Sequence, residues 1–258
     1  MCEIAQDTQK KAIGNIACIV NRLYISIIYN HGGAMATGRK LMIMAKGATK
    51  AAGIHRAKKE GDWEVWTLND MHYPDLDPVH FELHQWTPEY ANWMLAKNDL
   101  RKLRKVYMIQ AVPELPNSEE LPLAEIIKTH DCNYLGNTIA LQLAFALYQH
   151  KRGDTIKTLA LYGVDYITQA TLDFQTSRDA NFLMAITEWT DEQRDTFRMG
   201  TVEATYGRAC TEYWLGRMAE CGIGFVVHAQ SELFTTSPGW GRHIYGYEGD
   251  IMHGKGHG

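Results

Sequence analysis

Short, uniformly apolar runs recur along the chain, separated by segments of mixed polar and apolar character. A run without alternation is typical of a strand buried on both faces of a parallel sheet, and turn residues bound several of these runs. The predicted strands are Leu41–Ala45, Trp63–Leu68, Val79–Leu83, Val106–Val112, Thr158–Tyr162 and Ile223–Val227.

Segments with apolar residues at helical spacing lie between these runs. One helix is predicted to begin at Thr87-Pro88, a favourable N-cap followed by proline at the first helical position, and to continue to about Lys105. Further helices are predicted over Leu135–Lys151 and Glu203–Cys221. Strands that alternate with helices predict a Rossmann-like α/β fold, an open, mostly parallel sheet with helices on both faces.

The ends of the chain differ from the regular region, which we expect to form one domain over residues 40–247. Residues 1–39 are predicted to be an extension, and the Gly-Gly pair before Met35 leads to the hypothesis that residues 1–34 are translated upstream sequence and not native. The alternative is a short helix packed on the domain. The glycine- and histidine-rich tail, residues 248–258, is predicted to be disordered.

Residues 168–199 interrupt the rhythm of the domain. Two parts of this segment, 179–189 and 191–198, have helical character. A long excursion after the carboxyl end of a strand is typical of a lid over a binding site, although a passive surface insertion explains it equally well.

Composition places the chain among ordinary globular proteins. It has 258 residues, 45% hydrophobic and 22% charged, and a formal net charge of −4, which gives no general footprint for nucleic acid. The basic cluster Arg101–Lys105 is typical of a solvated helix face. No apolar run is long enough to predict a membrane span. Five scattered cysteines without a CxxC motif predict reduced thiols and a cytoplasmic location.

Ligands of open α/β sheets bind outside the carboxyl ends of the strands, so the residues there are the candidates for function. The loop Lys46-Gly47-Ala48-Thr49 follows the first strand, and its small residues Gly47, Ala48 and Thr49 would allow backbone N–H groups to approach a phosphate. Asn69 and Asp70 follow the second strand and could bind a base or ribose. A tight turn and an Asx turn are the alternatives.

Two more strand ends carry polar residues. His80, Glu82 and His84 would share one face of the third strand, as a polar face near the ligand, a half-exposed strand or, with less support, a metal site. Gly163 and Asp165 follow a later strand and suit contact with a ribose or a diphosphate.

The start of the long helix provides another candidate anion site. Asn137 and Thr138 lie there, either binding a nucleotide or only capping the helix. No GxSxG or cysteine nucleophile motif is present, and a general base is the remaining catalytic option. His228, after the last strand, and His84 are the predicted bases, and Ser231 follows close enough to reach the ligand.

The order of these landmarks resembles a family of uncharacterised phage and prophage proteins with a Rossmann-like fold. The resemblance extends from about Lys40 to Tyr247. It is carried by Ile43–Thr49, Asp62–Asn69 (DWEVWTLN), Phe81–His84 (FELH), Asn137–Ala140, Leu161–Asp165 (LYGVD), Arg208–Gly216 (RACTEYWLG) and Ser231–Leu233. The chain is also distantly similar to bacterial sialyltransferase-like and motility-associated glycosyltransferase-like proteins.

The resemblance implies a binding site for an activated nucleotide. In the sialyltransferase-like enzymes, a glycine-rich first loop and an asparagine after the second strand hold a cytidine nucleotide, and a histidine acts as base. Gly47 and Asn69 match the first two by position, while His228 matches the third only loosely. Residues 168–199 depart from the compact phage pattern, which puts transfer of the acceptor site in doubt.

Together these features predict a nucleotide-sugar-dependent, glycosyltransferase-like enzyme in the cytoplasm, that of the host cell for a phage-encoded protein. The expected partner is a small-molecule nucleotide donor. No tightly bound cofactor is expected, and the acceptor, a divalent metal and a homo-oligomer are left open. The alternatives are a nucleotide-sequestering protein without catalysis, and a nucleotide hydrolase or lyase that would use a metal or a carboxylate pair such as Glu82 with Asp165.

Overall fold

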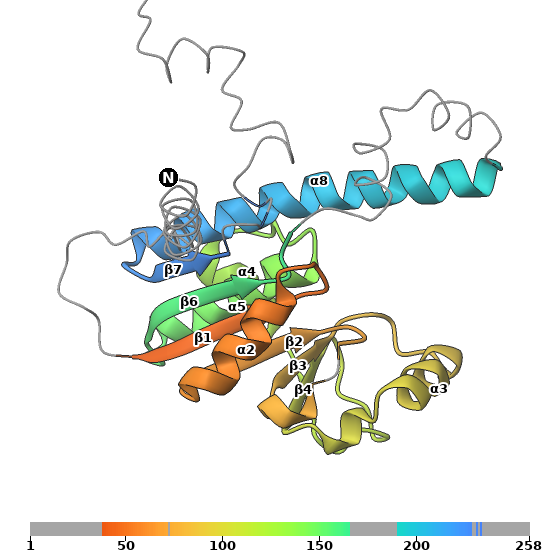
Figure 1. Cartoon of the computed structure of the whole chain (residues 1–258), viewed down its shortest axis with the longest axis horizontal. Helices are drawn as coiled ribbons and strands as arrows, with labels where there is room; N and C mark the ends of the chain where they lie inside the picture. Colours follow the sequence, from red (N-terminus) through yellow and green to blue (C-terminus); the bar gives the residue numbers. More distant parts are fainter. Residues whose placement is uncertain (1–37, 72, 166–189, 229–230, 232, 234–258) are drawn as a thin grey trace, which may run out of the picture.

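A computed structural model of the chain describes residues 38–71, 73–165, 190–228, 231 and 233, and only the backbone of 191–205. Its strands and helices follow one another along the chain (Figure 1). In order they are β1 (Arg39–Met44), α2 (Lys50–Glu60), β2 (Trp63–Leu68), η1 (Pro74–Leu76), β3 (Val79–Glu82), α3 (Pro88–Lys97), η2 (Leu100–Lys102), β4 (Lys105–Met108), β5 (Ser118–Glu120), α4 (Leu123–His130), α5 (Thr138–Lys151), β6 (Ile156–Tyr162), α8 (Asp191–Glu220) and β7 (Gly224–Val227).

The strands form a single parallel sheet, and the Rossmann-like architecture is confirmed. Its seven strands have the order β5-β4-β3-β2-β1-β6-β7. The chain builds outwards from β1 in one direction as far as β5 and then returns to place β6 on the other side of β1, with Met44 opposite Tyr162. The strand order therefore reverses between β1 and β6, which is the position where open α/β sheets bind ligands.

Helices cover both faces of the sheet. On one face, Phe145 of α5 stacks on Trp66 of β2, with ring centroids 5.7 Å apart, and α8 packs against α5 and the strand β7. On the other face lies α2, which comes so close to β6 that a Cβ at Gly53 would lie 2.7 Å from the Cβ of Tyr162. Residues 139–148 of α5 are buried without exception, as expected for a helix enclosed between the sheet and other helices.

A smaller apolar core supports α3. The cap is as predicted, because the Thr87 hydroxyl accepts a hydrogen bond from the Tyr90 amide at 3.2 Å and Pro88 opens the helix. Met94 is fully buried against the residues that follow α3. This core fixes the side of α3 that faces the ends of β2 and β3.

Several predicted boundaries are wrong. The helix from Thr87 ends at Lys97 instead of Lys105, and the strand predicted to reach Val112 ends at Met108 because Ile109 turns into solvent. The last helix begins at Asp191 instead of Glu203 and so includes the described end of the 168–199 segment. The elements α2, α4 and β5 were not predicted.

Other expectations fall on parts of the chain that the structure does not describe. The hypothesis on Met35, nearly all of the 1–39 extension, residues 168–189 and the 248–258 tail lie outside the described residues. Among the helices that are described, none combines the length and the apolar character needed to cross a membrane.

Candidate functional site

The predicted residues gather at the carboxyl edge of the sheet, as the parallel topology requires. Pairing brings Met44 next to Tyr162 and Leu68 next to Phe81, so the loops that follow β1, β2, β3 and β6 leave the sheet at the same edge. The start of α5 lies at this edge as well, because α5 leads into the amino end of β6. The candidates at this edge make different contacts, and they are described strand end by strand end.

The first set of contacts joins the loop after β1 to the end of β6. The carboxylate of Asp165 accepts hydrogen bonds from the Thr49 amide at 3.0 Å and from the Thr49 hydroxyl at 2.8 Å. The same hydroxyl accepts a bond from the Gly163 amide at 2.7 Å, and the Gly47 amide donates to the Gly163 carbonyl at 2.8 Å. Thr49 and Asp165 are both buried, so these bonds form a buried hydrogen-bond network that joins the two loops.

This hydrogen-bond network occupies the predicted phosphate position at the start of α2. A Cβ at Gly47 would lie 2.2 Å from an Asp165 carboxylate oxygen, so the small residue makes room for a protein carboxylate. The Thr49 amide, which would have pointed at a phosphate, already donates to that carboxylate. We therefore assign Thr49, Gly163 and Asp165 to the joining of β1 and β6.

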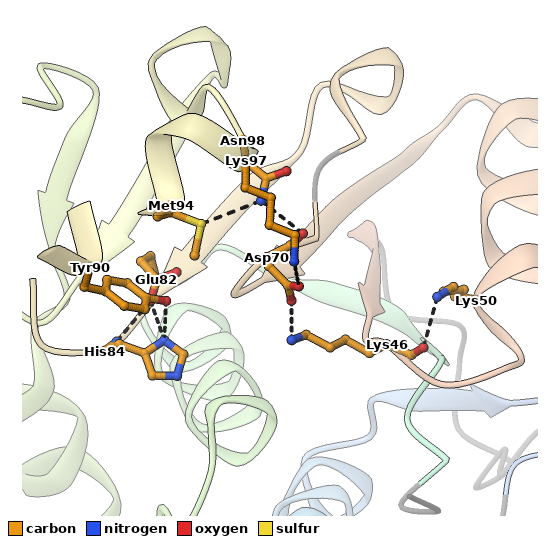
Figure 2. Close-up of polar contacts among 9 residues, drawn as sticks. All are labelled: Lys46, Lys50, Asp70, Glu82, His84, Tyr90, Met94, Lys97 and Asn98. Carbon is orange, nitrogen blue, oxygen red and sulfur yellow. Dashed lines mark hydrogen bonds and ion pairs between the residues drawn. The ribbon is translucent and has the colours of Figure 1, made fainter. Parts of the chain in front are cut away.

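A second set of contacts begins with Asn69 and Asp70 after β2. Asn69 adopts a left-handed backbone conformation with φ of 55°, and its amide donates to the Phe81 carbonyl at 3.0 Å, which extends the β2–β3 pairing. The Asp70 carboxylate forms ion pairs with Lys46 after β1 and Lys97 at the end of α3 (Figure 2). Asp70 thus joins three elements at one point.

The Asp70 carboxylate is stabilised in its ionised form. Although partial burial raises the pKa of Asp70, hydrogen bonds from Lys46 and Lys97 lower it to about 2. Lys50, at the start of α2, instead donates to the Lys46 backbone carbonyl at 3.2 Å, at the other end of the Lys46 residue from Asp70 (Figure 2). The local charge is positive, and both Lys46 and Lys97 have side chains about half exposed.

The end of the neighbouring strand β3 carries a carboxylate–imidazole pair. His84 Nδ1 lies 2.6 Å from Oε1 of Glu82, and the His84 amide donates to the same oxygen at 3.1 Å. The Tyr90 hydroxyl lies 2.9 Å from His84 Nδ1. Burial and the negative charge of Glu82 raise the pKa of Tyr90, so this hydroxyl keeps its proton.

The Glu82–His84 contact favours one tautomer of the histidine. The Glu82 side chain is fully buried while that of His84 is 51% exposed. A hydrogen bond from Nδ1 to the Glu82 carboxylate corresponds to the tautomer that has its lone pair on Nε2, and in this tautomer the Tyr90 hydroxyl faces a donor at Nδ1. The same arrangement of a buried carboxylate and a histidine orients general bases in hydrolases.

The predicted polar face of β3 is only partly formed. His80 is fully buried, and its Nδ1 lies 2.9 Å from the Thr67 hydroxyl, separate from the Glu82–His84 pair. Glu82 and Asp165 are likewise held apart, each by its own partners. Across the described residues, no group of three or more histidine, cysteine, aspartate or glutamate side chains is arranged to hold a metal ion.

His228 lies on the other side of the edge, after β7. Its ring centroid is 5.9 Å from that of Tyr162, and burial lowers its pKa while the charge of Asp165 opposes the shift. The Ser231 hydroxyl donates to the Val164 carbonyl at 2.8 Å and is buried, so it holds the end of β6 instead of reaching for a ligand.

The start of α5 is capped as predicted. The side-chain oxygen of Asn137 accepts a hydrogen bond from the Ala140 amide at 2.7 Å, and Thr138 is the first residue of the helix. This contact accounts for one of the free amides of the first turn. Asn137 therefore acts as the N-cap of α5, which was the alternative to nucleotide binding. Thr138 lies next to it at the carboxyl edge of the sheet.

Three residues of the site were not among the predicted site residues. Lys46 and Lys97 acquire their role by meeting Asp70, and Tyr90 by meeting His84. A signal for two of them is present in the sequence, because Tyr90 and Lys97 are seven residues apart and therefore lie on the same side of a helix. Comparison of the chain with protein-family models, with curated proteins and with solved structures gives no match.

Proposed function

We propose that the protein is a nucleotide-sugar-dependent transferase of the glycosyltransferase-like kind, with the donor bound at the carboxyl ends of β1, β2 and β3. The observation that carries this proposal is the arrangement on two adjacent strand ends. A buried carboxylate orients His84 after β3, and lysines surround Asp70 after β2. A base next to a cationic group is what transfer from a phosphorylated donor to a hydroxyl needs.

His84 supplies the base. Its Nε2 carries the lone pair, so it takes the proton of the acceptor hydroxyl as the acceptor oxygen attacks the donor carbon. The buried Glu82 carboxylate then stabilises the imidazolium that results, as in other carboxylate–histidine pairs. His228 is a weaker candidate, because its burial disfavours the protonated form that a base must adopt after the transfer.

The lysines supply the leaving-group site. As the bond from the donor carbon to the phosphate oxygen breaks, its electron pair stays on the phosphate, and the extra negative charge is met by Lys46 and Lys97. This position replaces the one expected at Thr49, whose amide is bonded to Asp165. Asn69 keeps its expected role toward the base or ribose in this proposal, since its side-chain oxygen is buried at the strand end and accepts no hydrogen bond from any described residue.

The resemblance to the phage family and to the sialyltransferase-like proteins supports the same proposal from the sequence. It favours a cytidine nucleotide in the donor and a protein that acts in the cytoplasm. The acceptor is then a molecule with a free hydroxyl.

Binding is tested by thermal unfolding in the presence of CMP, CDP and UDP and of their sugar conjugates. A ligand at 100 times its Kd stabilises a protein by about 2.7 kcal/mol. We expect stabilisation by at least one of these compounds, and about tenfold weaker binding in Lys46→Ala and Lys97→Ala. Lys58→Ala is the control, because Lys58 forms an exposed ion pair with Asp75 away from the site. The absence of stabilisation by every compound would contradict the proposal.

Catalysis is tested by hydrolysis of the bound donor and by transfer. His84→Asn should bind nucleotide as the unmodified protein does and turn over about 10²- to 10⁴-fold more slowly. Turnover that survives in His84→Asn and is lost in His228→Ala would move the base to His228 and overturn our assignment. Nucleotide binding without any turnover would instead identify a sequestering protein.

A further inference from the structure

Helix α3 connects the two halves of the proposed site along one of its sides. Tyr90, Trp93 and Lys97 are spaced three and four residues apart, which places them in one row on a helix. Tyr90 at one end of the row contacts His84, and Lys97 at the other end contacts Asp70. Trp93 therefore lies between the proposed base and the proposed phosphate site.

The rings of this row touch one another in sequence. The centroids of His84 and Tyr90 are 5.3 Å apart, and those of Tyr90 and Trp93 are 5.6 Å apart. Lys97 Nζ lies 5.1 Å from the Trp93 centroid, so the cation that reaches Asp70 also lies over the indole. A continuous aromatic surface thus leads from the imidazole to the lysine.

Trp93 itself is 49% exposed, which is unusual for the largest apolar side chain. Met94, its neighbour in the helix, is fully buried and holds α3 against the protein. The packing of the helix therefore does not explain why a tryptophan stands at position 93. The indole presents a flat apolar surface. Its two neighbours in the row, Tyr90 and Lys97, carry polar groups that contact His84 and Asp70 of the proposed site. A ligand group that lies on the indole would therefore lie next to Tyr90 and Lys97.

We propose that Trp93 is a stacking platform for a pyranose ring of the substrate, held between His84 and Lys97. This inference rests on the proposed function and names the ring that its site would bind. One face of a pyranose carries C–H groups that pack on the negative face of an indole, while its rim carries hydroxyls. A pyranose therefore matches a platform with a base at one end, whereas a nucleobase offers no hydroxyl to His84.

The test measures saturation-transfer NMR of methyl glucoside, methyl galactoside and methyl N-acetylglucosaminide with the full chain, together with the indole N–H signal of Trp93. That signal is assigned as the one missing from Trp93→Phe. We expect at least one glycoside to shift it, with binding at least about fivefold weaker in Trp93→Ala and nearly retained in Trp93→Phe. Tyr206→Ala removes another exposed aromatic ring, on α8, and should leave binding unchanged.

Two results overturn the platform. One is the absence of any effect of the glycosides on Trp93, and the other is a shift caused by cytidine or adenosine but by none of the glycosides. The outcome is separable from that of the proposed function. Stabilisation by a nucleotide with no glycoside at Trp93 removes the platform alone, whereas glycoside binding at Trp93 without any effect of nucleotides removes the nucleotide-dependent transfer alone.

Discussion

At the scale of single residues, the close approach of the loops after β1 and β6 requires a residue without a Cβ atom at position 163. Gly163 has φ of 69°, and a Cβ there would lie 2.0 Å from the Ala45 carbonyl oxygen. Gly61 has nearly the same φ, 70°, but a Cβ there would meet nothing within 4 Å. The two glycines therefore separate the effect of backbone strain from that of steric overlap.

We predict that Gly163→Ala destabilises the protein by more than 3 kcal/mol, since strain of about 1–3 kcal/mol is added to an overlap with backbone that cannot move aside. Gly61→Ala should destabilise it by strain alone, about 1–2 kcal/mol. Urea unfolding of both variants provides the measurement. Equal losses in the two would show that the loops of β1 and β6 separate at little cost.

The residues of the site were predictable to the extent that their positions follow from local pattern. Asn69, Asp70 and His84 were placed at the carboxyl edge because each directly follows an apolar run. Their partners were not predictable in this way. Asp165 meets Thr49 across 116 positions of sequence, and Lys97 meets Asp70 across 27, so both contacts depend on how distant elements pack.

At the scale of elements, Asp70 ties β2 to α3 and to the loop after β1. Helix α3 ends at Lys97, and the next residue, Asn98, adopts an extended backbone and donates a side-chain hydrogen bond to the Asp70 carbonyl at 3.1 Å. This explains why the helix does not reach Lys105. The ion pairs of Asp70 with Lys46 and Lys97 add an electrostatic connection, which depends on pH because the carboxylate must be ionised.

The Asp70 connection should be lost in acid. Its pKa falls from an ordinary value of 3.8 to about 2 on folding, so its contribution to stability is present above about pH 4 and disappears as pH falls through 2. Asp70→Asn should therefore be less stable than the unmodified protein at pH 6, and this difference should shrink between pH 4 and pH 2. Thermal unfolding across this range measures the difference.

Asp75→Asn is the matched control for this experiment. Asp75 pairs with Lys58 on the surface, where an ion pair contributes between 0 and about 1 kcal/mol. Its effect should be small at every pH. A difference between Asp70→Asn and the unmodified protein that stays constant from pH 6 to pH 2 would show that Asp70 acts by packing and not by charge.

The strands found from the sequence are those whose side chains are buried, whereas helix α3, which buries only Met94, was found from its cap. Strand β2 was predicted to the residue because five of its six side chains are buried. Strand β5, with the sequence Ser-Glu-Glu, lies at the edge of the sheet and has no apolar residue to announce it. Helix α2 buries only Gly53 and Ala57, so its contact with the sheet leaves no apolar stripe in the sequence.

At the scale of the whole molecule, three partly buried histidines share one electrostatic property. Burial lowers the pKa of His130, His150 and His228 below the ordinary value of 6.5. The unfolded chain therefore takes up protons at these positions before the folded one does. Their combined effect favours the folded state most at pH values above about 6.5.

We predict that the urea midpoint of unfolding falls when the pH is lowered from about 8 to about 5.5, in a range that lies above the titration of Asp70. His130→Asn should show a smaller fall over the same range, because one of the three histidines is removed, even where its stability at pH 8 is reduced. Chemical unfolding at the two pH values measures both quantities. A midpoint that does not change with pH would contradict the prediction.

The return of the chain to β1 has a consequence for synthesis on the ribosome. Roughly 110 residues separate β1 from β6, its partner on that side, so at about 5–20 residues per second the edge of β1 waits on the order of ten seconds for its neighbour. Helix α5, buried along residues 139–148, leaves the ribosome just before β6. We therefore expect α5 to cover the face of β1, β2 and β3 before the sheet is completed, and the long-range pairing of β6 with β1 to form late in folding.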